Sequence, residues 1–157
     1  MRHLKGTLAV TALLTLALPL GLGAEQAASK SAPRVINMTG TDNMRFQPSA
    51  ITAKPGERLR IVLKTTSTMP KAAMAHNFVM LKPGADIVKF VNASAMARPT
   101  FIAPKLKDQV LVASDLAGGG ETVTVEFSAP KAPGKYTFFC SFPGHYAGGM
   151  VGTLTVR

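Results

Sequence analysis

The sequence is short of the residue types that carry covalent cross-links and most side-chain chemistry. It has one cysteine, Cys140, among 157 residues, so no disulfide can form within the chain. It has three histidines, and His3 lies in the N-terminal segment, which leaves only His76 and His145 in the rest of the chain. We find no Ser/His/Asp arrangement and no paired acid and base that would indicate hydrolysis. The sequence also shows no internal repeat and no second domain.

The apolar run near the N-terminus, residues 8–18, is too short to cross a bilayer. It follows Arg2 and Lys5 and precedes a stretch rich in small residues, which is the order of a secretory signal peptide. We therefore expect residues 1–24 to be a signal peptide that directs the protein to the periplasm. No transmembrane segment is expected after cleavage.

Cleavage would leave 133 residues, enough for one compact domain with its own core. We expect a flexible linker at 25–33, which is polar and small, and a single domain at 34–157. Acidic residues are scarce, eight against 18 basic ones, and loss of the two basic leader residues lowers the formal net charge from +10 to +8. This charge favours acidic partners or anionic surfaces, or serves solubility alone. No nucleic-acid partner is expected, because no basic run is interleaved with aromatic residues.

From residue 34 onward, short β-type runs are separated by proline and glycine, which predicts an all-β antiparallel sandwich of seven or eight strands. A short helix or flap is expected around 85–97, where the apolar residues do not alternate. Tyr136, near the start of a late strand, is a candidate tyrosine corner that bonds to the backbone of the preceding loop. The expected strands are 35–39, 51–53, 59–64, 76–81, 110–114, 122–128, 135–140 and 151–156.

The lone thiol of Cys140 would oxidise in an exported protein unless something occupied it, and a metal ion does so by binding the deprotonated sulfur. Cys140, His145 and Met150 follow one another at five-residue steps, and His76 lies upstream in the apolar run 74–81. Two imidazoles, one thiolate and a weak axial thioether are the ligand set of a blue-copper electron-transfer site. The sequence therefore predicts one type 1 copper ion.

The spacing of these ligands suits such a site. We expect Cys140 to end one strand and Met150 to begin the last, while the loop between them folds His145 back over the metal. The strand that bears His76 must then pack beside the strand that ends at Cys140, because no local segment holds all four ligands.

Two neighbours are expected to support the ligands. Asn77 is a candidate to tie the ligand loop down, and the backbone N–H of Phe142 is a candidate donor to the sulfur. Taken singly, each candidate ligand also has an ordinary interpretation: a buried cysteine, a core histidine and a packing methionine are all common. The order C-x4-H-x4-M before a strand, with His-Asn upstream, favours copper.

In these motifs the chain resembles the cupredoxins of the azurin and auracyanin group, over about residues 35–157. The similar segments are 42–46, 69–79, 119–125 and 138–145. The resemblance implies a Greek-key β-sandwich, one mononuclear type 1 copper and single-electron carriage between redox proteins. The residues that it implies as ligands are His76, Cys140, His145 and Met150.

The sequence departs from the azurin pattern at several points. Azurins have a disulfide near the N-terminus, which one cysteine cannot form. They place three residues between the last histidine and the methionine, whereas four stand here, as in auracyanin-like proteins. Ala75 replaces the glycine whose carbonyl approaches copper axially, and Phe78 replaces a tryptophan often found there. We expect these changes to tune potential and colour rather than to prevent copper binding.

In the resembled family, the edge of the C-terminal histidine reaches an apolar surface patch. The candidates for such a patch here are Met69, Met74, Pro143, Tyr146 and Ala147. We expect the patch to dock a redox protein such as a c-type cytochrome or a reductase or oxidase, with surrounding lysines and arginines steering an acidic partner surface. The alternative is that Met69 and Met74 are ordinary core residues. A monomer is expected.

The predicted function is thus an exported single-electron carrier without catalytic chemistry of its own. The alternative is a periplasmic copper-handling protein, a chaperone or buffer. Such a protein would use an exposed Met/His site, so a buried Cys140 counts against it. A nitrite reductase or multicopper oxidase fragment would need further histidines, and a zinc site would not use methionine.

Overall fold

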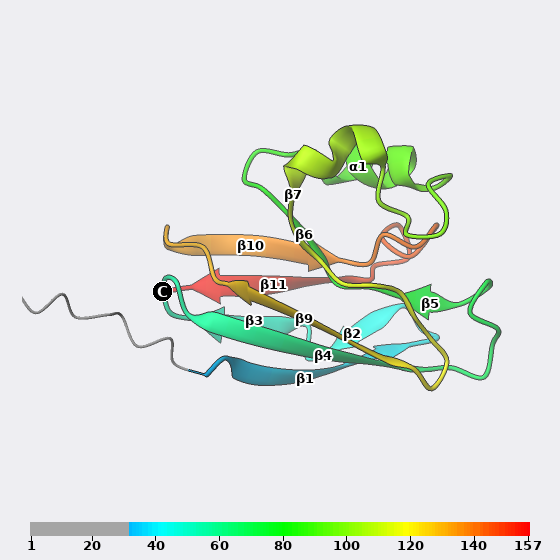
Figure 1. The fold of residues 1–157 in the computed structure, drawn as a ribbon, viewed down its shortest axis with the longest axis horizontal. Helices are drawn as coiled ribbons and strands as arrows, with labels where there is room; N and C mark the ends of the chain where they lie inside the picture. Colours follow the sequence, from blue (N-terminus) through cyan, green and yellow to red (C-terminus); the bar gives the residue numbers. More distant parts are fainter. Residues whose placement is uncertain (1–31) are drawn as a thin grey trace, which may run out of the picture. The chain divides into compact units, whose positions relative to one another are not determined.

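Two β-sheets face each other in the structure, a computed structural model that describes residues 32–157 (Figure 1). The predicted signal peptide and most of the predicted linker lie outside the described residues. The first sheet has the order β2 (Arg45–Gln47), β1 (Arg34–Thr41), β4 (Arg58–Thr66) and β9 (Thr122–Ser128). The second has the order β3 (Ala50–Ala53), β11 (Val151–Val156), β10 (Gly134–Phe139), β6 (Val79–Leu81) and β7 (Val110–Ala113). A separate pair joins β5 (Ala75–His76) to β8 (Ala117–Gly118).

The alternation of apolar and polar residues along β4 fixes which face of the first sheet is buried. Its inward residues are fully buried, and the partner residues on the edge strand β9 pack against them half-buried. The opposed pairs are Leu59 with Phe127, Ile61 with Val125 and Leu63 with Val123. Burial of one such aliphatic side chain stabilises the fold by about 1.5–3 kcal/mol. These pairs lie on the inner face of the first sheet, which packs into the core between the sheets.

Helix α1 (Ile87–Ser94) covers the other face of the second sheet, and it lies within the segment predicted to be a helix or flap. Asp86 caps the helix by accepting a hydrogen bond from the Lys89 N–H. Phe90 is fully buried, and its ring meets the edge of Phe139 at 6.0 Å between centroids. A 3₁₀ helix, η1 (Pro104–Gln109), completes this layer. The second sheet is therefore buried on both faces at β6 and at the end of β10, where Phe138 and Phe139 are both buried.

The predicted all-β sandwich is confirmed, but its sheets are mixed rather than purely antiparallel. β1 pairs with β4 in parallel, and β11 pairs with β3 in parallel. Both parallel pairs arise because the chain crosses to the other sheet before it returns. β3, for example, lies in the second sheet between β2 and β4 of the first.

The described residues contain eleven strands where seven or eight were predicted. β2 and β8 are two additional short strands, and the expected strand 76–81 divides into β5 and β6. It divides because His76 pairs with Ala117 of β8, whereas Val79 pairs with β7 and β10. Asn77 leaves the sheet between them to bond elsewhere. The predicted tyrosine corner is present, since the Tyr136 hydroxyl donates to the Ala132 carbonyl at 2.8 Å.

The strand register brings the metal-binding candidates to one end of the sandwich. Phe139 at the end of β10 lies opposite Val151 at the start of β11. Cys140 and Met150 are the next residues beyond this pair, and the Cys140 N–H donates to the Met150 carbonyl at 3.1 Å. In Figure 1 this end lies opposite the end marked C. Within residues 32–157, no helix has the length and apolar character needed to cross a membrane.

Candidate metal centre

Three side chains that are far apart in the sequence converge on one buried point. Nδ1 of His76 lies 3.2 Å from Nδ1 of His145, and the Cys140 sulfur lies 3.5 Å from the same His145 nitrogen. One donor atom from each residue lies within 4.8 Å of the others. His76 and Cys140 are fully buried, and His145 is 4% exposed. The donor atoms therefore face one another in a space closed to water.

His76 is held by the short pair β5–β8 and by a glycine beneath its ring. The backbone of His76 pairs with Ala117. On its other side the imidazole lies directly on Gly40 of β1, where an added Cβ would be 2.6 Å from the ring Cδ2. A side chain at position 40 would therefore displace the ring. Gly40 has no predicted role from the sequence, although a glycine within a strand is a signal of close approach.

The ligand loop is fixed by hydrogen bonds that run between the candidate ligands themselves. The His145 N–H donates to the Phe142 carbonyl at 3.1 Å, and the Met150 N–H donates to the His145 carbonyl at 2.9 Å. Gly144 takes φ +83°, the left-handed conformation that this turn requires and that glycine adopts freely. With the bond from Cys140 to Met150, the backbone links the three candidate ligands of this loop in a continuous chain.

Asn77 joins the two ligand-bearing segments through a reciprocal pair of hydrogen bonds. Its Nδ2 donates to the Ser141 hydroxyl at 2.9 Å, and its Oδ1 accepts from the Ser141 N–H at 2.9 Å. Both residues are buried. The side chain next to His76 therefore holds the residue next to Cys140, a partner that sequence reasoning did not identify.

Burial keeps all three donors uncharged in the metal-free protein. The pKa of His145 is lowered to about 4, mainly by loss of solvation and to a smaller extent by the charge of His76. Loss of solvation also lowers the pKa of His76, although Asp42 and the Thr41 carbonyl oppose the fall. Nε2 of His76 has no hydrogen-bond partner of good geometry among residues 32–157.

Burial raises the pKa of the Cys140 thiol to about 12, against the lowering effect of the Asn77 and Phe142 backbone N–H groups. The thiol of the metal-free protein should therefore resist modification at neutral pH, because the thiolate is the reactive form. We expect a thiol reagent such as Ellman's reagent to label the native metal-free protein at least about a hundredfold more slowly than the urea-unfolded chain, because the Cys140 sulfur is both closed to the reagent and held as the thiol. Equal labelling rates would show that the sulfur is accessible.

The donor set fits copper. Neutral imidazoles and a thiolate suit a copper ion, whereas magnesium and calcium need oxygen donors, and the cluster contains no carboxylate. Met150 is fully buried beside the cluster through its backbone bonds to His145 and Cys140. The Ala75 carbonyl faces the site, 3.9 Å from the Cys140 sulfur. Met150 and Ala75 therefore both adjoin the three converging side chains.

The predicted docking residues lie on two loops and differ in exposure. Met69 is 43% exposed and Met74 half-buried in the loop before β5, while Pro143 is exposed in the ligand loop. Tyr146 is half-buried, and its ring meets the edge of Phe139 at 5.7 Å. Ala147 is exposed. Tyr146 therefore has a packing role in addition to any part in docking.

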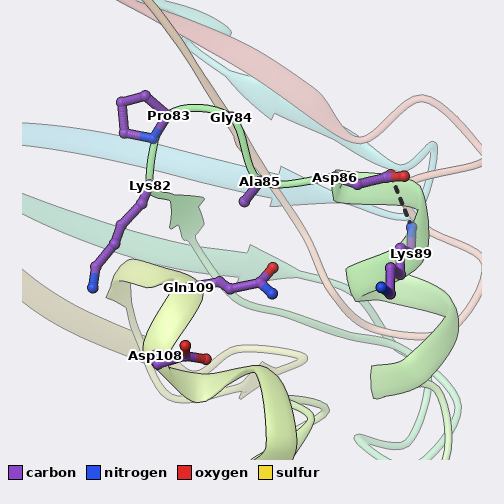
Figure 2. Close-up of a pocket in the computed structure, with 8 residues that line it drawn as sticks. All are labelled: Lys82, Pro83, Gly84, Ala85, Asp86, Lys89, Asp108 and Gln109. Carbon is purple, nitrogen blue, oxygen red and sulfur yellow. Dashed lines mark hydrogen bonds between the residues drawn. The ribbon is translucent and has the colours of Figure 1, made fainter.

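A separate pocket of about 510 Å³ lies between the loop before α1 and the end of η1 (Figure 2). Its lining is mixed, and the polar side chains in it are Lys82, Asp86, Lys89, Asp108 and Gln109. The Asp86 carboxylate is already used to cap α1 (dashed line in Figure 2). None of the three converging ligands lines this pocket, so it plays no part in the metal centre.

Comparison with known proteins identifies the class to which this fold and site belong. Residues 34–157 match the family model of copper-binding proteins of the plastocyanin/azurin family. The chain belongs to this family, the cupredoxins, and its cofactor is one type 1 copper ion, for which the cluster of His76, Cys140 and His145 provides a site.

Individual relatives place the chain in the azurin and auracyanin group of that family. Azurin of Pseudomonas fluorescens biotype C is 37% identical over 126 residues, covering 78% of this chain and 97% of that one. Auracyanin-B of Chloroflexus aurantiacus is 41% identical over 83 residues, but the match spans only 35% of its length. The dithionite-reduced auracyanin of the photosynthetic bacterium Roseiflexus castenholzii superposes with a TM-score of 0.69 at 32% identity, covering 80% of this chain and 98% of that one. Auracyanin A, a blue copper protein of Chloroflexus aurantiacus, gives 0.71 at 31% identity, covering 80% and 100%.

Proposed function

We propose that this protein is an exported carrier of single electrons that holds its copper with His76, Cys140, His145 and Met150. The observation that carries the proposal is the convergence of two neutral imidazoles and a thiol in a space closed to water. When bound, copper supplies a one-electron couple between Cu(I) and Cu(II). Export to the periplasm, with residues 1–24 as the signal peptide, 25–33 as the linker and 34–157 as the copper domain, belongs to the same proposal.

The chain contributes a rigid set of donors. His76 and His145 are held by backbone pairing and by the ligand loop, so neither ring is free to follow a change in the preferred geometry of the ion. The backbone N–H groups of Asn77 and Phe142 favour the thiolate of Cys140. Donors that stay fixed reduce the reorganisation that accompanies electron transfer.

Electrons leave and enter, in this proposal, through His145. It is the only one of the four ligands with measurable exposure, and Pro143 beside it is exposed. Met69, Met74 and Tyr146 would extend the contact surface for a redox protein such as a c-type cytochrome, a reductase or an oxidase with an acidic docking surface. The protein would act as a monomer and would catalyse no reaction of its own.

The complete burial of Cys140 disfavours the copper-chaperone alternative. A protein that hands copper to another exchanges ligands with its partner, and a sulfur that no partner can reach cannot take part in such an exchange. A catalytic copper centre would need further histidines, and residues 32–157 hold only His76 and His145.

The test is the visible absorption and EPR spectrum after Cu(II) loading, compared with Cys140→Ser. We expect an intense thiolate-to-copper band and narrow copper hyperfine splitting, both lost in Cys140→Ser because the hydroxyl cannot replace the thiolate. Met69→Leu, an exposed change outside the ligand set, is the control and should keep both signals. A pale spectrum with wide splitting that is indifferent to Cys140 would reject the proposal.

A further inference from the structure

The hairpin of β1 and β2, joined by the turn at residues 42–44, lies against both halves of the metal centre. On one side β1 supplies Gly40, on which the His76 ring rests. On the other side Met44 packs on the ligand loop: a Cβ added at Gly148 would lie 2.5 Å from the Met44 sulfur. One hairpin thus contacts His76 through Gly40 and the stretch between His145 and Met150 through Met44.

Arg45 makes this second contact a specific one. Its Nη1 donates to the Gly148 carbonyl at 2.7 Å and to the Met44 carbonyl at 2.8 Å, with the Asn43 carbonyl at 3.4 Å. The same nitrogen would be 2.9 Å from a Cβ at Gly149. Two consecutive glycines therefore leave room for the guanidinium to reach the backbone of the ligand loop.

The peptide between Gly148 and Gly149 is fixed from both sides. Arg45 holds its carbonyl, and the Gly149 N–H donates to the Tyr146 carbonyl at 2.9 Å. The next residue is Met150, whose backbone bonds directly to His145 and Cys140. A rotation of this peptide plane would therefore move Met150 and, through its backbone hydrogen bonds, the segments that carry His145 and Cys140.

We propose that Arg45 is a positioning residue of the copper site. Its guanidinium fastens the His145–Met150 segment to the β1–β2 hairpin, whose Gly40 also supports His76, so that the ligands keep one arrangement in both oxidation states. The inference rests on the proposed function for its consequence at copper. The hydrogen bond from Arg45 to the Gly148 carbonyl, which we call the brace, is made by the chain itself and does not need the metal.

Amide hydrogen exchange of the metal-free protein tests the brace alone. In Arg45→Gln we expect the Gly149 and Met150 amides to exchange about tenfold faster, the effect of losing one typical charge-assisted hydrogen bond. Arg45→Lys should recover part of the protection, because an ammonium can still donate to a carbonyl. The matched control is Arg34→Gln, since Arg34 is also exposed and also donates to a backbone carbonyl, that of Thr52, at the other end of β1.

The copper-loaded protein tests the consequence. Arg45→Gln should widen the copper hyperfine splitting and lower the reduction potential, because a looser Met150 segment lets Cu(II) approach its preferred tetragonal geometry. Arg45→Lys keeps the positive charge, so any difference in reduction potential between this variant and the unchanged protein comes from positioning and not from loss of charge. Arg34→Gln should leave both values unchanged.

Failure of the brace and failure of the proposed function give different results. If the unchanged protein shows no type 1 spectrum, the proposed function fails, and the exchange data still report on Arg45. If the spectrum is type 1 but Arg45→Gln matches Arg34→Gln in amide exchange and in potential, the positioning role of Arg45 is overturned.

Discussion

Replacing Gly40 by alanine is expected to abolish the type 1 copper spectrum. The new methyl group would lie 2.6 Å from Cδ2, 3.0 Å from Cγ and 3.2 Å from Cβ of His76. These atoms are not the free end of a flexible side chain, because β5 pairs His76 with Ala117 and the ring faces His145. Overpacking of this kind costs about 1–3 kcal/mol, and we expect the ring to move rather than β1, which is paired on both sides.

The measurement is a Cu(II) titration followed by absorption and EPR, together with urea unfolding of the metal-free protein. Gly84→Ala is the control: Gly84 has φ +83° and open space around it, so alanine there costs about 1 kcal/mol of backbone strain without touching the site. A Gly40→Ala protein that keeps narrow hyperfine splitting and wild-type copper affinity would show that the site tolerates a displaced ring.

Gly40 also marks the limit of what the sequence can predict. The spacing of Cys140, His145 and Met150 indicates a metal loop because those residues lie on one segment, and the loop's own hydrogen bonds set their placement. Gly40 meets His76, and Arg45 meets Gly148 across 103 residues, only after the two sheets have packed. A glycine within a strand signals that something approaches closely, but no local pattern names the partner, so these contacts depend on the fold as a whole.

The same distinction explains which parts of the fold were predictable. The alternation in β4 specifies a half-buried strand without knowledge of its partners, and residues 59–64 were assigned correctly. By contrast, the run 76–81 does not alternate, since Phe78 to Leu81 are all apolar, and periodicity cannot show that it divides between two sheets. Its division depends on the Asn77 side chain, which bonds to Ser141 instead of continuing a strand.

Loss of the Asn77 side chain should therefore be among the most costly changes near the site. In Asn77→Ala the buried Ser141 N–H loses its partner and the Ser141 hydroxyl loses a donor. An unsatisfied buried donor costs about 1–3 kcal/mol and a lost hydrogen bond about 1 kcal/mol more. We expect the free energy of unfolding of the metal-free protein to fall by about 3 kcal/mol, measured by urea denaturation, while Asn37→Ala, an exposed asparagine of β1, should change it by less than about 0.5 kcal/mol.

A double-mutant cycle with Ser141→Ala separates this bridge from general disruption of the core. Ser141→Ala removes the hydroxyl but keeps the N–H, so one of the two bonds to Asn77 survives. If the pair acts as a bridge, the two substitutions together should cost less than the sum of their separate costs by about 1 kcal/mol. Strict additivity would mean that the bond from Asn77 Nδ2 to the Ser141 hydroxyl adds nothing to stability, and that Asn77 acts through its bond to the Ser141 N–H and through packing. The ligand segments would then be held together by that backbone bond and by the strand pairing of β6 with β10.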